Sequence, residues 1–206
     1  MRACAQFKKN KFMIYWIGVL IILLLAMVVF RLLVRRDYLQ RGSLSPFSTF
    51  LEFLIFGLHA NLPYLYFTVP WPMLPPAPEH ILQYVLGLAA VIIGLLSTIA
   101  IMAYLGFSTS IGNQPRELRQ SGPYRWSRNP QLVSYGVLLM GFAILYPSWQ
   151  AVAWLALYGA IAHLMVTTEE EFLKTLFRKD YHQYCHQVPR YLGFAGRRSI
   201  LTASKE

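Results

Sequence analysis

The sequence predicts an all-α integral membrane protein with about five transmembrane helices and an amphipathic helix near the C-terminus. Three observations support this fold class. Hydrophobic residues make up 56% of the chain and charged residues only 14%, whereas soluble domains carry about a quarter charged residues. The apolar residues form blocks, and two blocks, 12–30 and 81–105, contain no charged residue. Each block has about the 20 residues that a helix needs to cross a bilayer.

The first apolar segment, 12–34, follows Lys8, Lys9 and Lys11, as the core of a signal peptide would. Its apolar run is longer than the 7–15 residues typical of such a core, and it ends at Arg31 without a cleavage site of small residues. We therefore expect a retained transmembrane helix, with a cleaved signal peptide as the less favoured alternative.

The second apolar segment, 47–68, is interrupted by Glu52, His59, Asn61 and Pro63. Three interpretations remain open: a full span, a re-entrant segment, or a helix whose polar side chains face the interior of a bundle. The stretch that follows, VPWPMLPPAPEH, is too rich in proline to be helical, and we expect it at the membrane interface.

Three further segments, 81–105, 131–146 and 149–168, complete the predicted bundle. The sequence YPSW joins the last two through a tight turn, which makes them a helical hairpin. A hairpin returns the chain to the side that it left. The loop 106–130 and the tail after the fifth segment are therefore expected on one face of the membrane.

The tail predicts an amphipathic helix, because large apolar residues recur at steps of three and four. They are Phe172, Leu173, Leu176, Phe177, Tyr181 and Tyr184. Such a helix suits a membrane surface or the end of a bundle. His182 and His186 have a spacing that can bind a metal, but no third ligand is evident. We expect a solvated helix face and no metal site.

The net charge of +10 does not indicate a nucleic-acid-binding protein, because the basic residues cluster at the ends of apolar segments. There they favour the cytoplasmic face and anionic headgroups, so membrane lipids are the expected partners. The loop before the fourth segment carries four arginines and one glutamate, which predicts a cytoplasmic position. Basic residues on both sides of the first segment leave the N-terminus unoriented. Cys4 and Cys185 are expected to be reduced.

Two polar clusters fall on this predicted face. The loop contains SGPYRWSRNP, and the fifth segment ends in TTEEEF, whose glutamates are Glu169, Glu170 and Glu171. Charges beside hydrocarbon are costly and call for an explanation. On residue types alone, a structural role of the three glutamates is slightly favoured over a functional role. They would either pair with nearby arginines or stabilise the N-terminus of a helix.

Taken together, GPYRWSRNP, the apolar hairpin and EEEFLKTLFRKDYHQYCHQVPR resemble the membrane-embedded methyltransferases. This family includes isoprenylcysteine carboxyl methyltransferase and the phospholipid N-methyltransferases. Its pattern is Gly-x-Tyr, Arg-His/Asn-Pro-x-Tyr, two apolar helices, Glu-Glu-x-x-Leu, Phe-Gly, two tyrosines three apart, and Val-Pro. The matching residues are Gly122, Tyr124, Arg128, Asn129, Pro130, Glu169, Glu170, Leu173, Phe177, Tyr181, Tyr184, Val188 and Pro189.

Three positions depart from the family pattern. Leu132 replaces a tyrosine, and Arg178 replaces a glycine. Met165 stands where the isoprenylcysteine enzymes have an arginine that contacts the substrate. The cofactor motif is thus largely retained, while the acceptor remains open between a prenylcysteine-type carboxylate and a lipid amine.

The resemblance implies an enzyme that binds S-adenosylmethionine at the cytoplasmic membrane boundary, between loop and tail, and methylates a lipophilic acceptor arriving through the bilayer. The expected cofactor-binding residues are Arg116, Leu118, Arg119, Tyr124, Asn129, Pro130, Gln131, Leu132, Glu169 and Glu170. No catalytic residue is assigned. Residues 1–105 would supply the N-terminal transmembrane helices, and residues 106–206 the methyltransferase core.

The residue types suit this ligand. Arg116 or Arg119 would hold its carboxylate by charge-assisted hydrogen bonds. Glu169 would accept from its ammonium group or ribose, with Glu170 orienting that side chain. Tyr124 would pack against the adenine or face the sulfonium, which an aromatic surface attracts.

Two rival functions remain. The sterol reductases resemble this C-terminal half and use NADPH, but they have about ten spans. A non-catalytic membrane subunit would use the same glutamates and arginines only for ion pairs. If the acceptor is an amine, His163 would be a candidate base, although a histidine hydrogen-bonded inside the bundle is the favoured interpretation.

Overall fold

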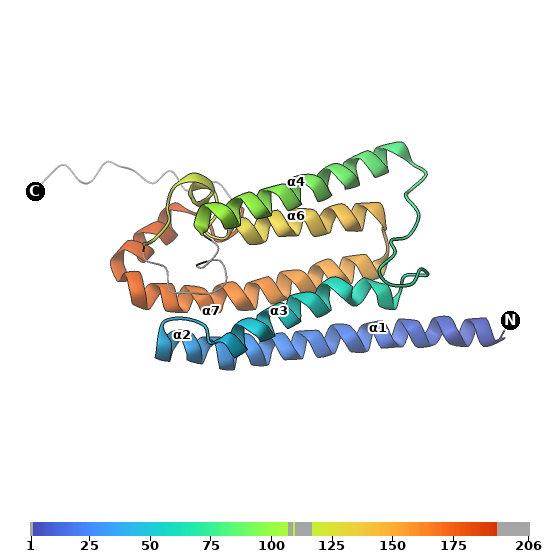
Figure 1. Cartoon of the computed structure of the whole chain (residues 1–206), viewed down its shortest axis with the longest axis horizontal. Helices are drawn as coiled ribbons and strands as arrows, with labels where there is room; N and C mark the ends of the chain where they lie inside the picture. Colours follow the sequence, from blue (N-terminus) through green and yellow to red (C-terminus); the bar gives the residue numbers. More distant parts are fainter. Residues whose placement is uncertain (1, 107–108, 110–116, 193–206) are drawn as a thin grey trace, which may run out of the picture.

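The computed structural model describes residues 2–106, 109 and 117–192, with side chains from residue 10 onward. Within these ranges all regular secondary structure is helical, and the helices form an elongated bundle (Figure 1). The elements are α1 (Arg2–Val28), the π-helical η1 (Val29–Val34), α2 (Arg35–Arg41), α3 (Pro46–Asn61), the 3₁₀ helix η2 (Leu62–Leu65), α4 (Ile81–Leu105), the 3₁₀ helix η3 (Gly122–Arg125), α6 (Pro130–Leu145) and α7 (Trp149–Gln187).

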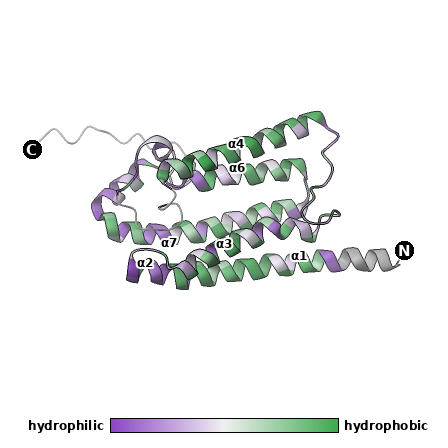
Figure 2. Ribbon diagram, in the orientation of Figure 1, coloured by the Kyte–Doolittle hydropathy of each residue, from purple (hydrophilic) through white to green (hydrophobic). Residues whose placement is uncertain are grey.

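The predicted all-α membrane fold is confirmed. Three helical stretches in the described residues are long and apolar enough to cross a membrane: Asn10–Arg41, Ile81–Leu105 and Trp149–Gln187. The apolar helix α6 is shorter. Apolar residues run along the helices, whereas hydrophilic residues concentrate at α2 and at the C-terminal part of α7 (Figure 2). With α3, these helices account for the five predicted segments.

Helix α3 buries Glu52 and His59 in the bundle, as the third interpretation of segment 47–68 expects, whereas Asn61 at its end is exposed. Glu52 is 9% exposed and His59 is fully buried. The His59 ring stacks on the Trp154 ring of α7, with their centroids 5.2 Å apart. The Trp154 indole donates a hydrogen bond of 2.8 Å to the His59 carbonyl, and His59 Nε2 lies 3.0 Å from the Trp154 carbonyl.

Local sequence fixes where the helices begin. Ser45 precedes α3 and its hydroxyl accepts from the Ser48 amide at 3.2 Å, with Pro46 in the first turn. Ser148 caps α7 in the same way, accepting from the Ala151 amide at 3.0 Å. A serine cap satisfies an amide that a helix start leaves unpaired, and proline suits the first turn. The turn YPSW therefore closes the predicted hairpin of α6 and α7.

The fifth segment and the amphipathic tail form one element, α7, rather than two separate helices. The element is interrupted at Arg178, whose backbone has φ 43° and ψ −111°. Arg178 is the only non-glycine residue with positive φ among the described residues. It is also the position at which the family pattern has glycine.

Arg178→Gly is expected to stabilise the protein by about 1 kcal/mol, because glycine adopts positive φ without the steric cost of a β-carbon. Thermal unfolding of the detergent-solubilised protein, followed by circular dichroism, measures the change. Lys174→Gly, at an exposed helical position of the same element, is the matched control and should lose about 1 kcal/mol. A loss of stability in both Arg178→Gly and Lys174→Gly would contradict this prediction.

The bundle has two parts. Helix α4 packs along α6, with Gly87 and Gly94 buried at their contact. Helices α1, α3 and α7 form the other part, around buried residues such as Tyr15 and Ile161. The Tyr15 hydroxyl donates to the Gln150 carbonyl of α7 at 2.7 Å. The loop after α4 and the C-terminal part of α7 meet at one end of the bundle, as the hairpin predicts (Figure 1).

Candidate active site

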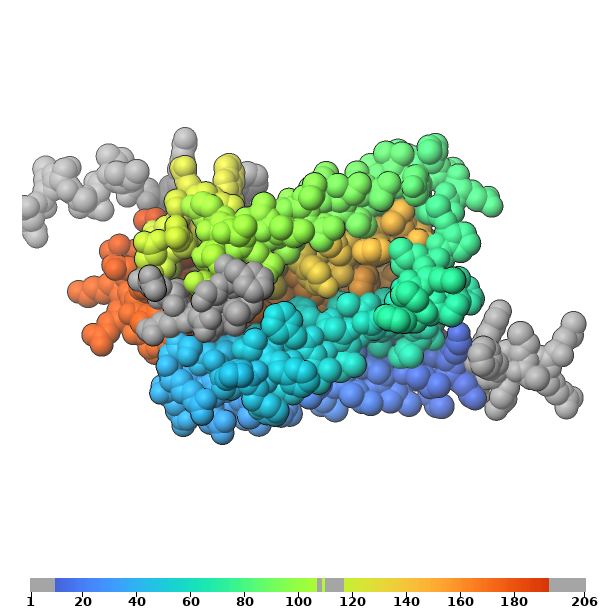
Figure 3. Space-filling view, viewed as in Figure 1, coloured from blue at the N-terminus to red at the C-terminus, as the bar shows by residue number. Residues whose placement is uncertain are grey.

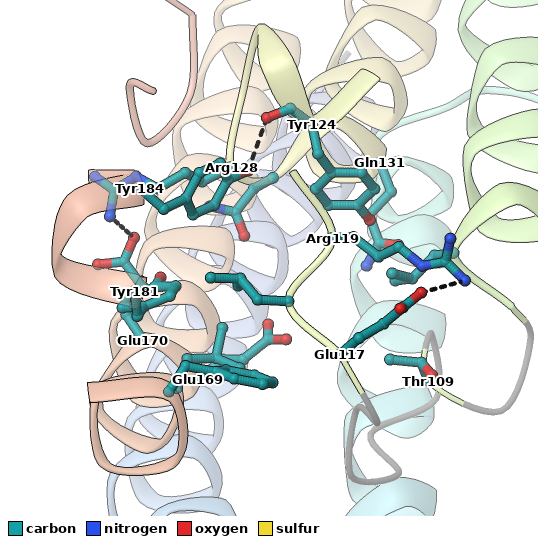
Figure 4. A pocket seen from close by; sticks show the side chains of 15 residues that line it. Thr109, Glu117, Arg119, Tyr124, Arg128, Gln131, Glu169, Glu170, Tyr181 and Tyr184 are labelled. Carbon is teal, nitrogen blue, oxygen red and sulfur yellow. Dashed lines mark hydrogen bonds and ion pairs between the residues drawn. The ribbon is translucent and has the colours of Figure 1, made fainter. Parts of the chain in front are cut away.

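A pocket lies where the loop after α4 meets α7. It is lined by Leu105, Thr109, Glu117, Leu118, Arg119, Tyr124, Arg128, Asn129, Gln131, Glu169, Glu170, Leu173, Phe177, Tyr181 and Tyr184. Figure 4 shows the glutamates Glu169 and Glu170 on α7, with Glu117, Arg119 and Tyr124 on the loop side. The pocket thus joins the two polar clusters that the sequence places on one face.

Most of the predicted site residues line this pocket. They are Leu118, Arg119, Tyr124, Asn129, Gln131, Glu169 and Glu170. Pro130 faces a depression beside α4, and Leu132 faces a groove bounded by α3 and α4. Successive residues of a helix point about 100° apart, so Gln131 reaches the pocket while its neighbours face elsewhere. Arg116 lies outside the described residues.

Glu170 is the anchor of a buried ion-pair cluster. Its carboxylate accepts from Arg128 Nη1 at 2.7 Å and from Arg190 Nη2 at 2.7 Å, and its side chain is 4% exposed. Arg128 comes from the loop and Arg190 from the segment after α7. The Glu170 carboxylate raises the pKa of Arg190 by accepting its hydrogen bond. For Glu170, the structural interpretation of the glutamates holds.

Glu171 also forms ion pairs, but outside the pocket. Its carboxylate lies 3.0 Å from Arg31 Nη1 and 2.6 Å from Arg35 Nε. These contacts connect the end of the first long helix to α7. Two of the three glutamates, Glu170 and Glu171, therefore have arginine partners.

Glu169 differs from both neighbours, because it has no hydrogen bond or ion pair with any residue that the structure describes. Its side chain lines the pocket. Two further groups of the lining are buried without hydrogen-bond partners, Arg128 Nε and Gln131 Oε1. Unsatisfied buried polar groups are rare in folded proteins. A carboxylate, an N–H donor and an amide oxygen therefore remain available to a ligand in this one pocket.

Tyr124 gives the pocket an aromatic wall and is held by the tail. Its carbonyl accepts a hydrogen bond of 2.8 Å from the Tyr184 hydroxyl. Burial, together with the nearby Glu169 charge, raises the pKa of Tyr124 above its ordinary value. The ring is therefore a neutral surface beside a carboxylate at neutral pH.

The segment after α7 folds back over the start of α6. The Pro189 carbonyl accepts from the Arg128 amide at 3.0 Å. The Arg190 carbonyl accepts from Asn129 Nδ2 at 3.0 Å. Asn129 therefore uses its amide N–H to hold the tail against the loop, while its side chain also lines the pocket.

Several lining residues are absent from the predicted site. Leu173, Phe177, Tyr181 and Tyr184 carry the tail periodicity and belong to the family motif, so the signal was present. Glu117 pairs with Arg119 at 3.0 Å, a contact that only the folded loop creates.

The histidines do not contribute to this pocket. His163 is exposed and lies 3.3 Å from the Tyr191 hydroxyl. It has the expected hydrogen bond but does not face the bundle interior. The rings of His182 and His186 are in contact, and within the described ranges no group of three or more His, Cys, Asp or Glu side chains is arranged to hold a metal ion.

Residues 82–180 match the model of a family described as phospholipid methyltransferase. The matched segment begins in α4, includes the loop and α6, and ends in the C-terminal part of α7. No curated protein and no solved structure matches the chain significantly.

Proposed function

We propose, because residues 82–180 match the phospholipid methyltransferase family, that this membrane protein is a methyltransferase. We propose further that it binds S-adenosylmethionine in the pocket between the loop and α7. One observation carries the proposal: Glu169, Arg128 and Gln131 line one pocket inside the matched segment, and each carries a polar group without a partner among the described residues.

The available groups fit the chemistry of this cofactor. Arg128 Nε and the Arg119 guanidinium would donate to its carboxylate or hydroxyl oxygens. Glu169 would accept from its ammonium group or ribose, and Gln131 Oε1 from a second N–H or O–H. The neutral Tyr124 ring offers a surface for the adenine or the sulfonium.

S-adenosylmethionine, when bound, supplies a methyl group on a positively charged sulfur. The protein's contribution is to hold both reactants in line and to exclude water, which accounts for much of the rate in such displacements. The cluster of Glu170, Arg128 and Arg190 supports this function by fixing the loop and the tail around the pocket. We assign no catalytic residue.

The pocket end of the bundle is proposed to face the cytoplasm. The ion pairs of Arg31 and Arg35 with Glu171 place the basic end of the first long helix beside α7. That end therefore carries Arg31, Arg35, Arg36 and Arg41 together with the loop arginines. At the opposite end, Lys11 donates to the Phe67 carbonyl at 3.2 Å. The positive-inside rule supports a cytoplasmic pocket and an N-terminus on the other side.

The acceptor is proposed to be lipophilic and to arrive from the bilayer, either as a prenylcysteine-type carboxylate or as a lipid amine. The described family favours lipid acceptors. We also propose that residues 1–105 contribute the N-terminal transmembrane helices and that residues 106–206 form the catalytic core. The two parts contact each other where α4 packs on α6 and where α1 packs on α7.

Glu169→Gln is expected to reduce the affinity for S-adenosylhomocysteine at least tenfold, because a hydrogen bond to a charged group contributes about 1.5–3 kcal/mol. The fold should stay intact, since Glu169 has no ion pair with a described residue to lose. Isothermal titration calorimetry of the detergent-purified protein measures the affinity, with NADPH as a parallel ligand.

Glu171→Gln is the matched control, because it removes the same charge from the same helix outside the pocket. The affinity of this variant for S-adenosylhomocysteine should equal that of the wild type. Binding of NADPH alone would favour the reductase alternative. Binding of neither ligand to folded wild-type protein would favour a non-catalytic subunit.

A further inference from the structure

A second cavity, of about 300 Å³, opens beside the cofactor pocket. It lies between α3 and α4, with residues of α6 and α7 at its base (Figure 3). Its lining is mostly apolar and includes Phe53, Phe56, Met102, Leu132 and Met165. The Phe53 side chain is largely exposed on the lipid-facing surface of α3. This groove therefore suits an alkyl chain that enters from the bilayer.

Glu52 is the one acidic residue among the described residues that line the groove, and it is nine-tenths buried. It forms no hydrogen bond or ion pair with any residue in the described part of the chain. A carboxylate without a compensating partner inside a transmembrane bundle is costly and is retained where it serves a function. Thr49, Phe53 and Phe56 share its helix face, so the carboxylate is presented into the groove.

The groove adjoins the proposed cofactor pocket. Gln131 lines both cavities. The polar head of an amphiphile in the groove would therefore lie next to the cofactor pocket while its chain extends toward the lipid.

The charge of the groove selects among possible acceptors. None of the described residues that line it carries a positive charge, and Met165 is apolar. A carboxylate acceptor would place like charges together, whereas an amine or ammonium head donates charge-assisted hydrogen bonds to Glu52. An amphiphile with a neutral head group and an alkyl chain of equal length would form only an ordinary hydrogen bond with Glu52.

We propose that this groove is the acceptor site and that Glu52, which lies outside the matched segment 82–180, positions a lipophilic amine and excludes carboxylate acceptors. The proposal rests on the proposed methyltransferase function and narrows its acceptor to an amine. It gives the N-terminal half of the chain a direct role in specificity.

The test uses binding to the full-length protein in phosphatidylcholine nanodiscs, without cofactor. Dodecylamine, dodecanol and dodecanoate serve as probes with equal chains and different heads, and calorimetry measures each affinity. The wild type should bind the amine about tenfold more tightly than the alcohol and the carboxylate least. Glu52→Gln should reduce the amine affinity about tenfold and leave the alcohol affinity unchanged.

Two variants complete the design. Glu52→Asp keeps the charge and should retain part of the preference for the amine. Glu79→Gln removes one charge at an exposed position in the loop before α4 and should behave as wild type, which controls for partitioning into the bilayer. The thermal midpoint of Glu52→Gln should equal or exceed that of the wild type, because the variant no longer buries an unpaired carboxylate.

The outcomes separate the two proposals. If the wild type does not bind S-adenosylhomocysteine, the proposed function fails whatever the alkyl probes show. If amine and alcohol bind equally, or if Glu52→Gln lowers the thermal midpoint and leaves the amine affinity unchanged, Glu52 is a structural residue and this inference is wrong.

Discussion

Glu170→Ala is expected to destabilise the protein by about 3 kcal/mol, the largest effect of any single side-chain truncation proposed for the pocket. The change would leave Arg128 buried beside an apolar tyrosine cluster without its counter-charge. Breaking a buried ion pair by removing one partner typically costs about 3–5 kcal/mol. The lower end applies here, because the Arg190 side chain is 34% exposed and can recover hydration. Thermal unfolding in detergent, followed by circular dichroism, measures the loss.

Glu171→Ala is the matched control for this prediction. Its two arginine partners are 42% and 47% exposed, and exposed ion pairs contribute at most about 1 kcal/mol. Equal losses in the two variants would show that Glu170 does not hold a buried cluster. Glu170→Ala should also weaken S-adenosylhomocysteine binding, whereas Glu169→Gln should weaken binding without a loss of stability.

Gly94→Ala is expected to destabilise the bundle by about 3 kcal/mol. A β-carbon at this position would lie 2.7 Å from Leu138 Cα and 2.8 Å from Leu138 Cβ. The obstructing atoms belong to or adjoin the backbone of α6, so the two helices would have to separate. Overpacking a tight contact costs about 1–3 kcal/mol, and a contact with backbone falls at the upper end. Small residues allow this close approach of membrane helices.

Gly159→Ala, on α7, tests the same substitution where space is available. Apart from its chain neighbours and the backbone of its own helix, no described residue has an atom within 4 Å of the β-carbon that it would add. The variant should be neutral or more stable by about 1 kcal/mol, because alanine favours a helix over glycine by that amount. Thermal midpoints of the two variants, measured together, give the comparison. If Gly94→Ala is as stable as Gly159→Ala, α4 and α6 do not pack in the way described.

The three consecutive glutamates show how one helix serves different purposes within a single turn. Glu169 faces the pocket, Glu170 faces Arg128, and Glu171 faces Arg31 and Arg35. Steps of about 100° around α7 separate the three directions. The ion pairs of Glu170 and Glu171 fit the structural interpretation of this cluster, and the proposed cofactor-binding role falls to Glu169.

The sequence by itself determined the helical membrane fold and the end of the bundle that carries the site. Apolar length defines a span, and Ser148 and the residues around it define a tight turn, so both are local properties of the chain. The hairpin of α6 and α7 then brings the loop and the tail to one end. The spacing of Tyr124, Glu169 and Tyr181 within the family pattern was also visible in the sequence.

The tertiary structure alone decided which polar side chains are paired and which remain available. Glu170 finds Arg128 at a separation of 42 residues, and Glu171 finds Arg31 at a separation of 140 residues. Such partners depend on how helices rotate and pack against one another, which periodicity within one helix does not specify. For the same reason, Glu52 could be seen as an interruption in an apolar segment, but only the packing of α3 against its neighbours placed it in a groove beside the pocket.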